Sequence, residues 1–210
     1  MSLQAVNLGL PKTGTTTLAK ALRLSGLSVA DHRLRGRQVD DPVLKKQFVA
    51  DVLYRGYFAT GDPLAEIPGI GAISEMSMLN SERSLWPQCD FALISAIRTH
   101  HPGVKFLASW RDPFTLSQSM LGWNTMGIER LPASAIPGLP SGYGETTRER
   151  VQWIEGHYAT LSHWFRDDPD FLLFDIADPT APEKIGAHLG RDLPWWGQLN
   201  ANPDMDRERA

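Results

Sequence analysis

The chain has 210 residues, of which 42% are hydrophobic and 21% charged, and its formal net charge at pH 7 is −3. These values exclude a mainly disordered chain, and the single cysteine excludes a disulfide scaffold. No apolar run reaches ~18 residues, so we expect no membrane span. The pI near 6.1 argues against a nucleic-acid partner. One globular domain over residues 1–210 is the expectation.

The charge is unevenly distributed along the chain. Residues 1–60 contain nine Lys and Arg against four Asp and Glu, and the remaining residues contain twelve against twenty. A basic N-terminal third suits a small anionic ligand, and it is also typical of a solvated face. The N-terminus has no basic stretch and no signal-type cleavage site, so we expect a cytoplasmic protein.

The first elements have the order strand, glycine loop, helix. Residues 4–8 form a short apolar strand candidate, and residues 9–14 break regular structure. Residues 15–24 then have a helical apolar face that ends before Gly26. This order is typical of the opening of α/β nucleotide-binding folds.

Strands and helices alternate along the rest of the chain. Short apolar runs predict strands at 27–30, 71–74, 104–110 and 171–174. Helical spacing and capping residues predict five helices: from Asp41-Pro42 to residue 57, over 90–101, over 113–122, from a capping box at 146–149 to residue 165, and from a second capping box at 180–183 to Gly190. The alternation predicts a single α/β domain with a mainly parallel central sheet.

Two segments lack a periodic pattern. Residues 124–144 are rich in Gly, Pro and Ser, a composition that favours a mobile lid loop over a packed element. Residues 197–210 form a polar tail. We therefore expect both segments to be irregular.

The glycine loop is typical of an anion-binding loop, because backbone N–H groups and the helix dipole converge there. Its sequence is Gly9-Leu10-Pro11-Lys12-Thr13-Gly14-Thr15-Thr16. A triphosphate-binding loop has lysine directly after its second glycine, and this chain has Thr15 there. No apolar strand ends in an Asp that could hold magnesium. We therefore expect protein charges, and no metal, to hold the anion.

A second group of candidate residues follows the strand predicted at 104–110. Arg111 leaves the carboxyl end of that strand, where ligands gather in open α/β sheets, and Ser119 lies on the next predicted helix. An arginine fork and a hydroxyl can together bind a terminal phosphate. Pairing of Arg111 with a neighbouring carboxylate is the alternative.

Together the two motifs resemble the sulfotransferase family that uses 3′-phosphoadenosine 5′-phosphosulfate (PAPS). The family's P-K-[ST]-G-[ST]-[ST] loop corresponds to Pro11-Lys12-Thr13-Gly14-Thr15-Thr16. Its R-[DN]-P motif, with a serine eight residues after the arginine, corresponds to Arg111-Asp112-Pro113 and Ser119. His101-Pro102-Gly103-Val104-Lys105-Phe106-Leu107 is similar to the family's P-x-x-K-F-I strand entry. The resemblance continues through residues 173–190 and covers most of the chain.

The resemblance implies a three-layer, P-loop NTPase-like fold and transfer of a sulfuryl group from PAPS to a hydroxyl or amine acceptor. Displacement would be in line and without a metal, leaving adenosine 3′,5′-bisphosphate. The 5′-phosphosulfate would be bound by Lys12, Thr13, Gly14, Thr15 and Thr16, and the 3′-phosphate by Arg111 and Ser119. Lys12 would also stabilise the leaving phosphate. The acceptor would be a small molecule or a carbohydrate.

Three features of the family are missing from this chain. Many members have a second arginine five residues after the first, and this chain has Leu116 there. The R-K-G loop and the catalytic histidine of the cytosolic small-molecule enzymes have no counterpart. The chain therefore resembles a compact, bacterial-type member.

The acceptor needs a base. Glu75 is the first candidate because it ends a predicted strand, and Ser74-Glu75-Met76-Ser77 is similar to the E-K-[ST]-P stretch of some family members. Asp90 and the His100-His101 pair are the alternatives, although a helix C-terminus accounts for two histidines without catalysis.

Several other residue types have a plainer explanation than catalysis. Cys89 is expected to be a small core residue, and His157 and His163 to be surface or interface groups on a long helix. Trp123, Trp195 and Trp196 could stack on a base or a sugar, with core packing as the default.

Two further functions stay open from the sequence. One is a P-loop kinase for a small metabolite, which Thr15 in place of the motif lysine disfavours. The other is a catalytically silent nucleotide-binding module, which would keep Lys12 and Arg111 and lack a usable base. Neither the acceptor nor the oligomeric state follows from the sequence.

Overall fold

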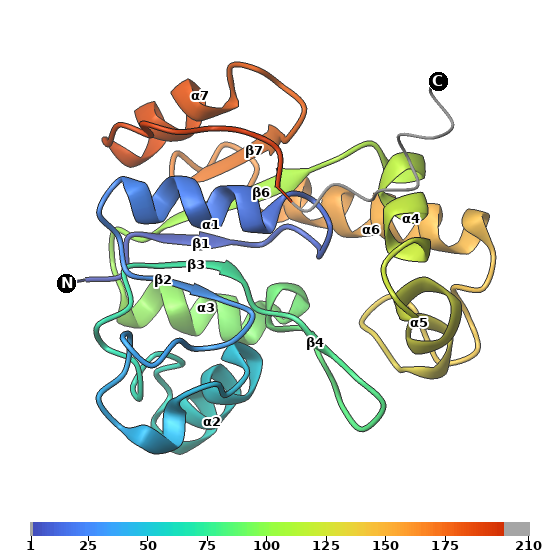
Figure 1. Cartoon of the computed structure of the whole chain (residues 1–210), viewed down its shortest axis with the longest axis horizontal. Coiled ribbons are helices and arrows are strands. Elements are labelled where there is room, and N and C mark those ends of the chain that lie inside the picture. Colours follow the sequence, from blue (N-terminus) through green and yellow to red (C-terminus); the bar gives the residue numbers. More distant parts are fainter. Residues whose placement is uncertain (1, 200–210) are drawn as a thin grey trace.

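The computed structural model describes residues 2–199 and has a five-stranded, all-parallel central sheet (Figure 1). The strand order is β2-β3-β1-β6-β7. The strands are β1 Ala5–Asn7, β2 Val29–Asp31, β3 Ala72–Glu75, β6 Lys105–Trp110 and β7 Phe171–Asp175. The predicted α/β class and the mainly parallel sheet are confirmed, and all five predicted strands lie within one or two residues of their expected bounds.

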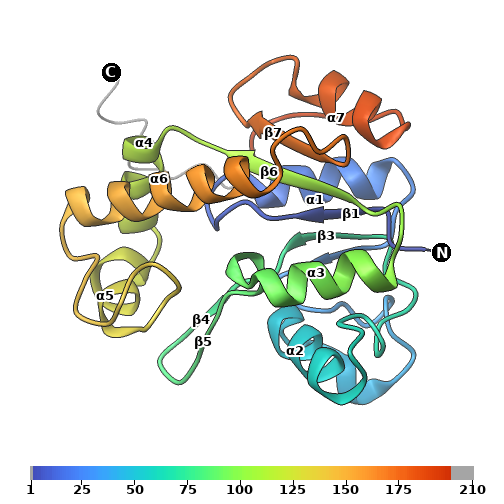
Figure 2. The ribbon, with the colours of Figure 1, turned by 180° about the vertical axis from the view of Figure 1, so that it is seen from behind.

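Helices cover both faces of the sheet, which gives three layers (Figures 1 and 2). The helices are α1 Thr15–Leu24, α2 Val49–Thr60, α3 Phe91–His100, α4 Pro113–Leu121, α5 Leu131–Ala133, α6 Thr147–Trp164 and α7 Ala181–Leu189. Side chains of β1 alternate between two cores. Ala5 packs into the core of α1 and α7, and Val6 packs into the larger core of α2, α3, α4 and α6.

The position of β1 determines where a ligand site can form. β1 pairs in parallel with β3 on one side and with β6 on the other. The chain leaves β1 toward the face of α1, whereas it leaves β6 toward the opposite face, where α4 and α6 pack. Loops that diverge in this way open a crevice at the carboxyl ends of the two strands, which is where open α/β sheets bind ligands.

Local capping signals account for several of the helix ends. The Asp112 carboxylate accepts from Thr115 N at 2.8 Å and begins α4, and the capping box of Thr146 and Glu149 begins α6. Gly190, at φ 60°, ends α7. The residues that form each cap are only a few positions apart in the sequence, so the sequence pattern is sufficient to predict the cap.

The helix predicted from Asp41-Pro42 to residue 57 is wrong in its first half. Pro42–Leu44 form one 3₁₀ turn, and α2 begins only at Val49. Between them, Lys46 N donates to Leu34 O and Leu34 N donates to Gln47 O, both at 2.9 Å. These bonds hold 45–48 in a non-helical turn, with Lys46 at φ 67°.

Two other local predictions need correction. Thr180 does not cap α7 with its side chain, because its hydroxyl donates to Asp178 at 2.7 Å instead. A hairpin of β4 Met78–Leu79 and β5 Ser84–Leu85, which the sequence patterns did not indicate, projects beyond the main sheet (Figure 1).

The segment 124–144 is more regular than its composition predicts. It contains a π-helical turn at Met126–Arg130, directly followed by α5. Its apolar side chains reach the core at uneven intervals: Met126, Leu131, Ile136 and Leu139 are all buried. The absence of a period therefore reflects short, irregular turns that nevertheless pack. Movement of this segment as a lid stays a prediction.

The end of the chain is described only in part. Residues 197–199 have no regular structure, as expected, and the rest of the predicted irregular tail, 200–210, lies outside the described residues. Among residues 2–199, no helix is both long enough and apolar enough to cross a membrane.

Candidate functional site

The residues 9–16, here called the anion loop, connect the central strand β1 to α1. Gly14 begins the helix at φ 84°, and a Cβ there would lie 2.3 Å from Ile176 Cγ1. Only glycine therefore fits this position. Lys12 also has a positive φ, 73°, a strained conformation for a residue with a side chain. The loop places the backbone N–H groups of the first turn of α1 at the sheet edge, a geometry suited to an anion.

A buried network of polar side chains holds the anion loop to β6. The Thr13 hydroxyl donates to Leu10 O at 2.6 Å and lies 2.7 Å from Ser109 Oγ. Asn7 Nδ2 donates to Ser109 Oγ at 3.1 Å and to Ser74 O at 2.9 Å, which links β1 to both of its neighbours. The Thr13 N–H also donates to Leu10 O, at 3.4 Å, so both donors of this buried residue contact the loop itself.

Tyr158 and His157 of α6 support the loop from the opposite face. The Tyr158 hydroxyl donates to Ser109 O at 2.7 Å and accepts from Leu10 N at 3.2 Å. His157 Nε2 lies 2.9 Å from Leu8 O. Neither contact was predicted: the sequence analysis assigned His157 to a surface or interface, and the helical spacing showed only that Tyr158 lies on the apolar face of α6.

The pair of His157 and Cys89 is not a catalytic dyad. A carbonyl oxygen only accepts, so His157 Nε2 carries the proton and Nδ1 accepts from Cys89 Sγ at 3.6 Å. Burial lowers the pKa of His157 to about 4 and raises the pKa of Cys89 to about 12. Both groups therefore stay neutral at pH 7, and Cys89 is a largely buried residue packed against the core, as expected.

Two predicted cationic residues, Lys12 and Arg111, lie close together at this edge. Arg111 directly follows β6, next to β1. Burial, with the nearby Arg111 charge as the second cause, lowers the pKa of Lys12 to about 8. Lys12 Nζ lies 3.4 Å from the centre of the Trp123 ring, which follows α4. The predicted Ser119 is buried on α4.

Glu75 ends β3 beside the anion loop. It is only 6% exposed, and its carboxylate accepts from the backbone N–H and the hydroxyl of Ser77. Burial, and to a smaller extent the charge of Asp31, raises the pKa of Glu75 to about 7, although hydrogen bonds from Ser77 and Thr15 oppose that shift. The structure thus places the first candidate base in contact with a residue of the loop.

The alternative bases are held elsewhere. The Asp90 carboxylate caps α3 by accepting from Ala92 N and Leu93 N. His100 and His101 end α3 at the amino end of β6, so the length of that strand, about 20 Å, separates them from Arg111. His101 Nε2 instead contacts Asp62 Oδ1 at 2.9 Å. Among the three candidates, only Glu75 contacts the anion loop.

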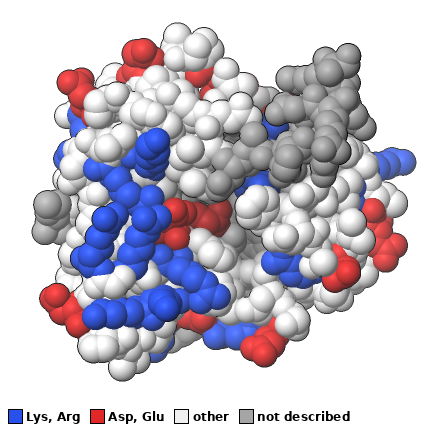
Figure 3. Space-filling view, in the orientation of Figure 1, with Lys and Arg blue, Asp and Glu red and all other residues white. Residues whose placement is uncertain are grey.

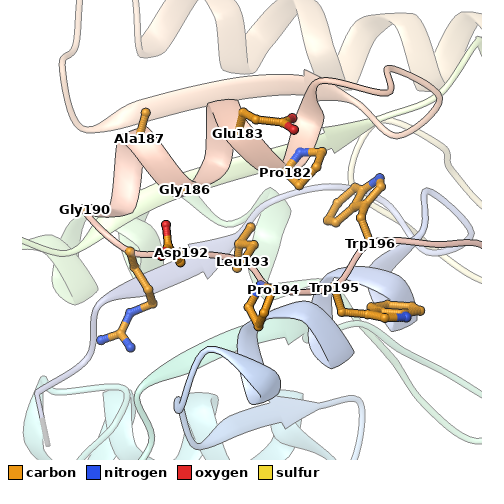
Figure 4. A pocket seen from close by; sticks show the side chains of 11 residues that line it. Pro182, Glu183, Gly186, Ala187, Gly190, Asp192, Leu193, Pro194, Trp195 and Trp196 are labelled. Carbon is orange, nitrogen blue, oxygen red and sulfur yellow. The ribbon is translucent and has the colours of Figure 1, made fainter.

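The segment 190–196 runs beside α7 and borders a groove of about 870 Å³ (Figure 4). Trp196 lies on the side of Pro182, and its ring packs edge-on against Phe174 at 6.3 Å between centres. Trp195 lies against Lys20 of α1, with the ammonium 3.8 Å from the ring centre. Trp195 and Trp196 thus pack against other side chains of the protein and border the groove beside α7.

The site can therefore hold a multiply charged anion and has a carboxyl group beside it. Among residues 2–199, no group of three or more His, Cys, Asp and Glu side chains is arranged to hold a metal ion. No known family model matches the chain, and no curated protein matches its sequence.

Proposed function

We propose that this protein is a PAPS-dependent sulfotransferase. The observation that carries the proposal is the meeting of three predicted elements at one sheet edge: the anion loop after β1, Arg111 after β6 and Glu75 at the end of β3. The motif resemblance in the sequence requires these residues to be neighbours, although they are far apart along the chain.

The residues present fit a phosphosulfate. Gly14 is restricted to glycine because the Ile176 side chain packs where a Cβ would lie, and this contact fixes the backbone of the loop. Lys12 and Arg111 add two positive charges, and the proximity of Arg111 contributes to the lowered pKa of Lys12. A group with several negative charges would relieve this repulsion. PAPS carries charge at both of its phosphate positions, which matches a loop and an arginine on adjacent strands.

The residues divide the chemistry between them. When bound, PAPS would supply an activated sulfuryl group. The Lys12 ammonium would donate to the bridging oxygen as the sulfur–oxygen bond breaks, and the N–H groups of the loop would hold the phosphate that leaves. The Glu75 carboxylate would take the proton from the acceptor hydroxyl as its oxygen bonds to sulfur.

The environment of Glu75 favours an enzyme over a silent binding module. A general base works best with a pKa near the working pH, and burial brings the pKa of Glu75 to about 7. A module that only binds a nucleotide has no use for a costly buried carboxylate beside its loop. The metabolite kinase is disfavoured by Thr15, which stands where that class has its lysine.

Calorimetry with adenosine 3′,5′-bisphosphate, AMP, ATP and GTP, each with and without magnesium, tests the proposal. We expect the bisphosphate to bind without magnesium and more tightly than AMP, because Arg111 and Ser119 would contact the 3′-phosphate. Equal affinity for the bisphosphate and AMP would contradict the proposal. Magnesium-dependent binding of ATP in preference to the bisphosphate would favour the kinase.

A further inference from the structure

Five exposed cationic side chains gather on one face of the molecule, outside the site described above. They come from the segment 31–48, which follows β2, and are here called the basic surface: Arg33, Arg35, Arg37, Lys45 and Lys46. Figure 3 shows Lys and Arg concentrated over the face that carries α1, β2 and this segment, with a smaller group of Asp and Glu directly beside them.

The backbone beneath the basic surface is fixed. The hydrogen bonds between Leu34 and 46–47 tie the two ends of the segment together, and Leu34 is only 1% exposed. The Arg33 guanidinium lies 3.5 Å from the centre of the Phe48 ring and donates to Lys46 O at 2.8 Å. The cationic groups are therefore presented by an ordered loop, which reduces the entropy lost when a ligand binds.

The charge of the basic surface is only partly compensated. Asp31 accepts from Arg23 at 3.1 Å and lies 3.7 Å from Arg35. Within residues 2–199, no ion pair involves Arg37, Lys45 or Lys46. Burial, together with Arg35 and Arg37, lowers the pKa of Arg23. The positive charges therefore repel one another, and a bound anion would relieve that repulsion.

The basic surface begins next to Glu75. Asp31 at the end of β2 pairs in register with Glu75. His32 N donates to Glu75 O at 2.9 Å, and His32 Nδ1 lies 3.1 Å from Ser77 O. A molecule that lies on the basic surface can therefore extend one end toward the carboxylate.

The ligand must be anionic, short and rich in hydroxyl groups. The same segment also carries the exposed carboxylates of Asp40 and Asp41, so a long uniform polyanion would also meet negative charge. The overall charge of −3 also disfavours nucleic acid. A hydroxyl is required if the ligand is to react at Glu75.

We propose that the basic surface binds an acidic oligosaccharide and directs one of its hydroxyl groups to the site at Glu75. Binding of the oligosaccharide depends only on the basic surface, whereas delivery of a hydroxyl to Glu75 rests on the proposed function. The carboxylate or sulfate groups of the sugar would pair with Arg37, Lys45 and Lys46, the basic-surface cations for which residues 2–199 provide no ion pair.

Fluorescence anisotropy with a labelled heparin-derived hexasaccharide tests the binding step without cofactor. Maltohexaose, which has the same length and no charge, is the neutral probe. The double variant Arg37→Ala/Lys45→Ala is compared with Arg148→Ala/Arg166→Ala, which removes the same charge from exposed positions elsewhere. We expect the first variant to weaken binding of the acidic probe about tenfold and the second to leave it nearly unchanged.

Three outcomes would overturn the inference: equal affinity for the acidic and neutral probes, equal losses in the two double variants, or tighter binding of a single-stranded oligonucleotide that depends on the same residues. Titration with adenosine 3′,5′-bisphosphate separates the two proposals. If the protein binds the acidic probe at the basic surface but does not bind the bisphosphate, the inference about the basic surface holds and the proposed sulfotransferase function is contradicted. If the protein binds the bisphosphate but not the acidic probe, the proposed function holds and the inference about the basic surface is contradicted.

Discussion

The anion loop and the basic surface both concentrate positive charge, but they do so by opposite means. In the anion loop, buried side chains such as Asn7, Thr13 and Ser109 bond to one another, and Lys12 is partly desolvated. In the basic surface, cations such as Arg37 and Lys45 are exposed to solvent on a loop that is held by backbone hydrogen bonds and by the buried Leu34.

The difference shows how burial sets the strength of a charge. A charge in a desolvated crevice acts strongly on a single ligand position, whereas exposed charges are screened and act weakly and together. Substitutions in the crevice should therefore cause large, specific losses, and substitutions on the basic surface should cause small ones. The following predictions proceed from the largest expected effect to the smallest.

Glu75→Gln should reduce transfer activity ~10²–10⁴-fold, because the amide keeps the shape but cannot accept a proton. Binding of adenosine 3′,5′-bisphosphate should stay intact. In the parent protein, the rate should rise as the pH passes through about 7, the pKa of Glu75, and this limb should vanish in the variant. Single-turnover assays across pH measure both effects, with the exposed Glu155→Gln as the control. Near-normal turnover by Glu75→Gln would transfer the role of base to another residue.

Glu75→Gln should reduce activity but increase the stability of the folded protein at high pH. The folded-state pKa of Glu75 lies above its ordinary 4.5, so the stability that the protonated form contributes is lost as the pH rises from about 4.5 to about 7. A shift of this size corresponds to ~3 kcal/mol. Glu75→Gln should therefore be more stable than the parent at pH 8 and similar to it at pH 4. Urea unfolding at the two pH values checks the sign.

Lys12→Ala should reduce kcat ~10²–10³-fold with a much smaller change in cofactor affinity, because Lys12 acts on charge that develops as the phosphate leaves. Lys20→Ala is a matched control, since this lysine also lies over a tryptophan ring, Trp195, but outside the anion loop. Steady-state kinetics separates the parameters. If the loss appeared only in KM for PAPS, Lys12 would serve in binding alone.

Arg111→Ala should weaken binding of adenosine 3′,5′-bisphosphate by ~1.5–3 kcal/mol, the range for hydrogen bonds to a charged group. AMP affinity should change little, because AMP lacks the 3′-phosphate. Calorimetry with both nucleotides measures the difference. Equal losses for the two ligands would place Arg111 near the 5′-phosphate instead.

Tyr158→Phe should lower the free energy of unfolding by ~1–2 kcal/mol, because Leu10 N and Ser109 O both lose their partner. Tyr143→Phe, at a residue that is 55% exposed, should have almost no effect. Urea unfolding of the two variants gives the comparison. A similar stability of both variants would mean that water replaces the Tyr158 hydroxyl without loss.

The parts of the fold that sequence patterns predicted are those whose causes lie within a few residues. The Asp112-Pro113 cap, the Thr146–Glu149 capping box and the glycine at the end of α7 are of this kind. The break before α2 is not, since it depends on bonds between Leu34 and 46–47. The segment 126–139 buries apolar residues at intervals that match neither a helix nor a strand.

The candidate site shows the same division. The anion loop, Arg111 and Glu75 could be predicted because strand ends and loop motifs are visible in the sequence. Tyr158 and His157 could not, because their partners Ser109 and Leu8 lie 49 and 149 residues away along the chain. A helix pattern shows which face is buried but not which backbone group a buried hydroxyl will meet.

The central position of β1 also has a consequence for synthesis on the ribosome. This strand is translated before both of its neighbours, and Ala5 aligns with Ala72 and with Lys105 in the finished sheet. Its second neighbour therefore emerges about 100 residues later, and the Tyr158 hydroxyl that holds the loop emerges later still. Contacts between such distant segments form slowly, so β1 stays without its second neighbour while about 100 further residues are made. The growing chain therefore exposes one edge of an apolar strand, which is prone to aggregation.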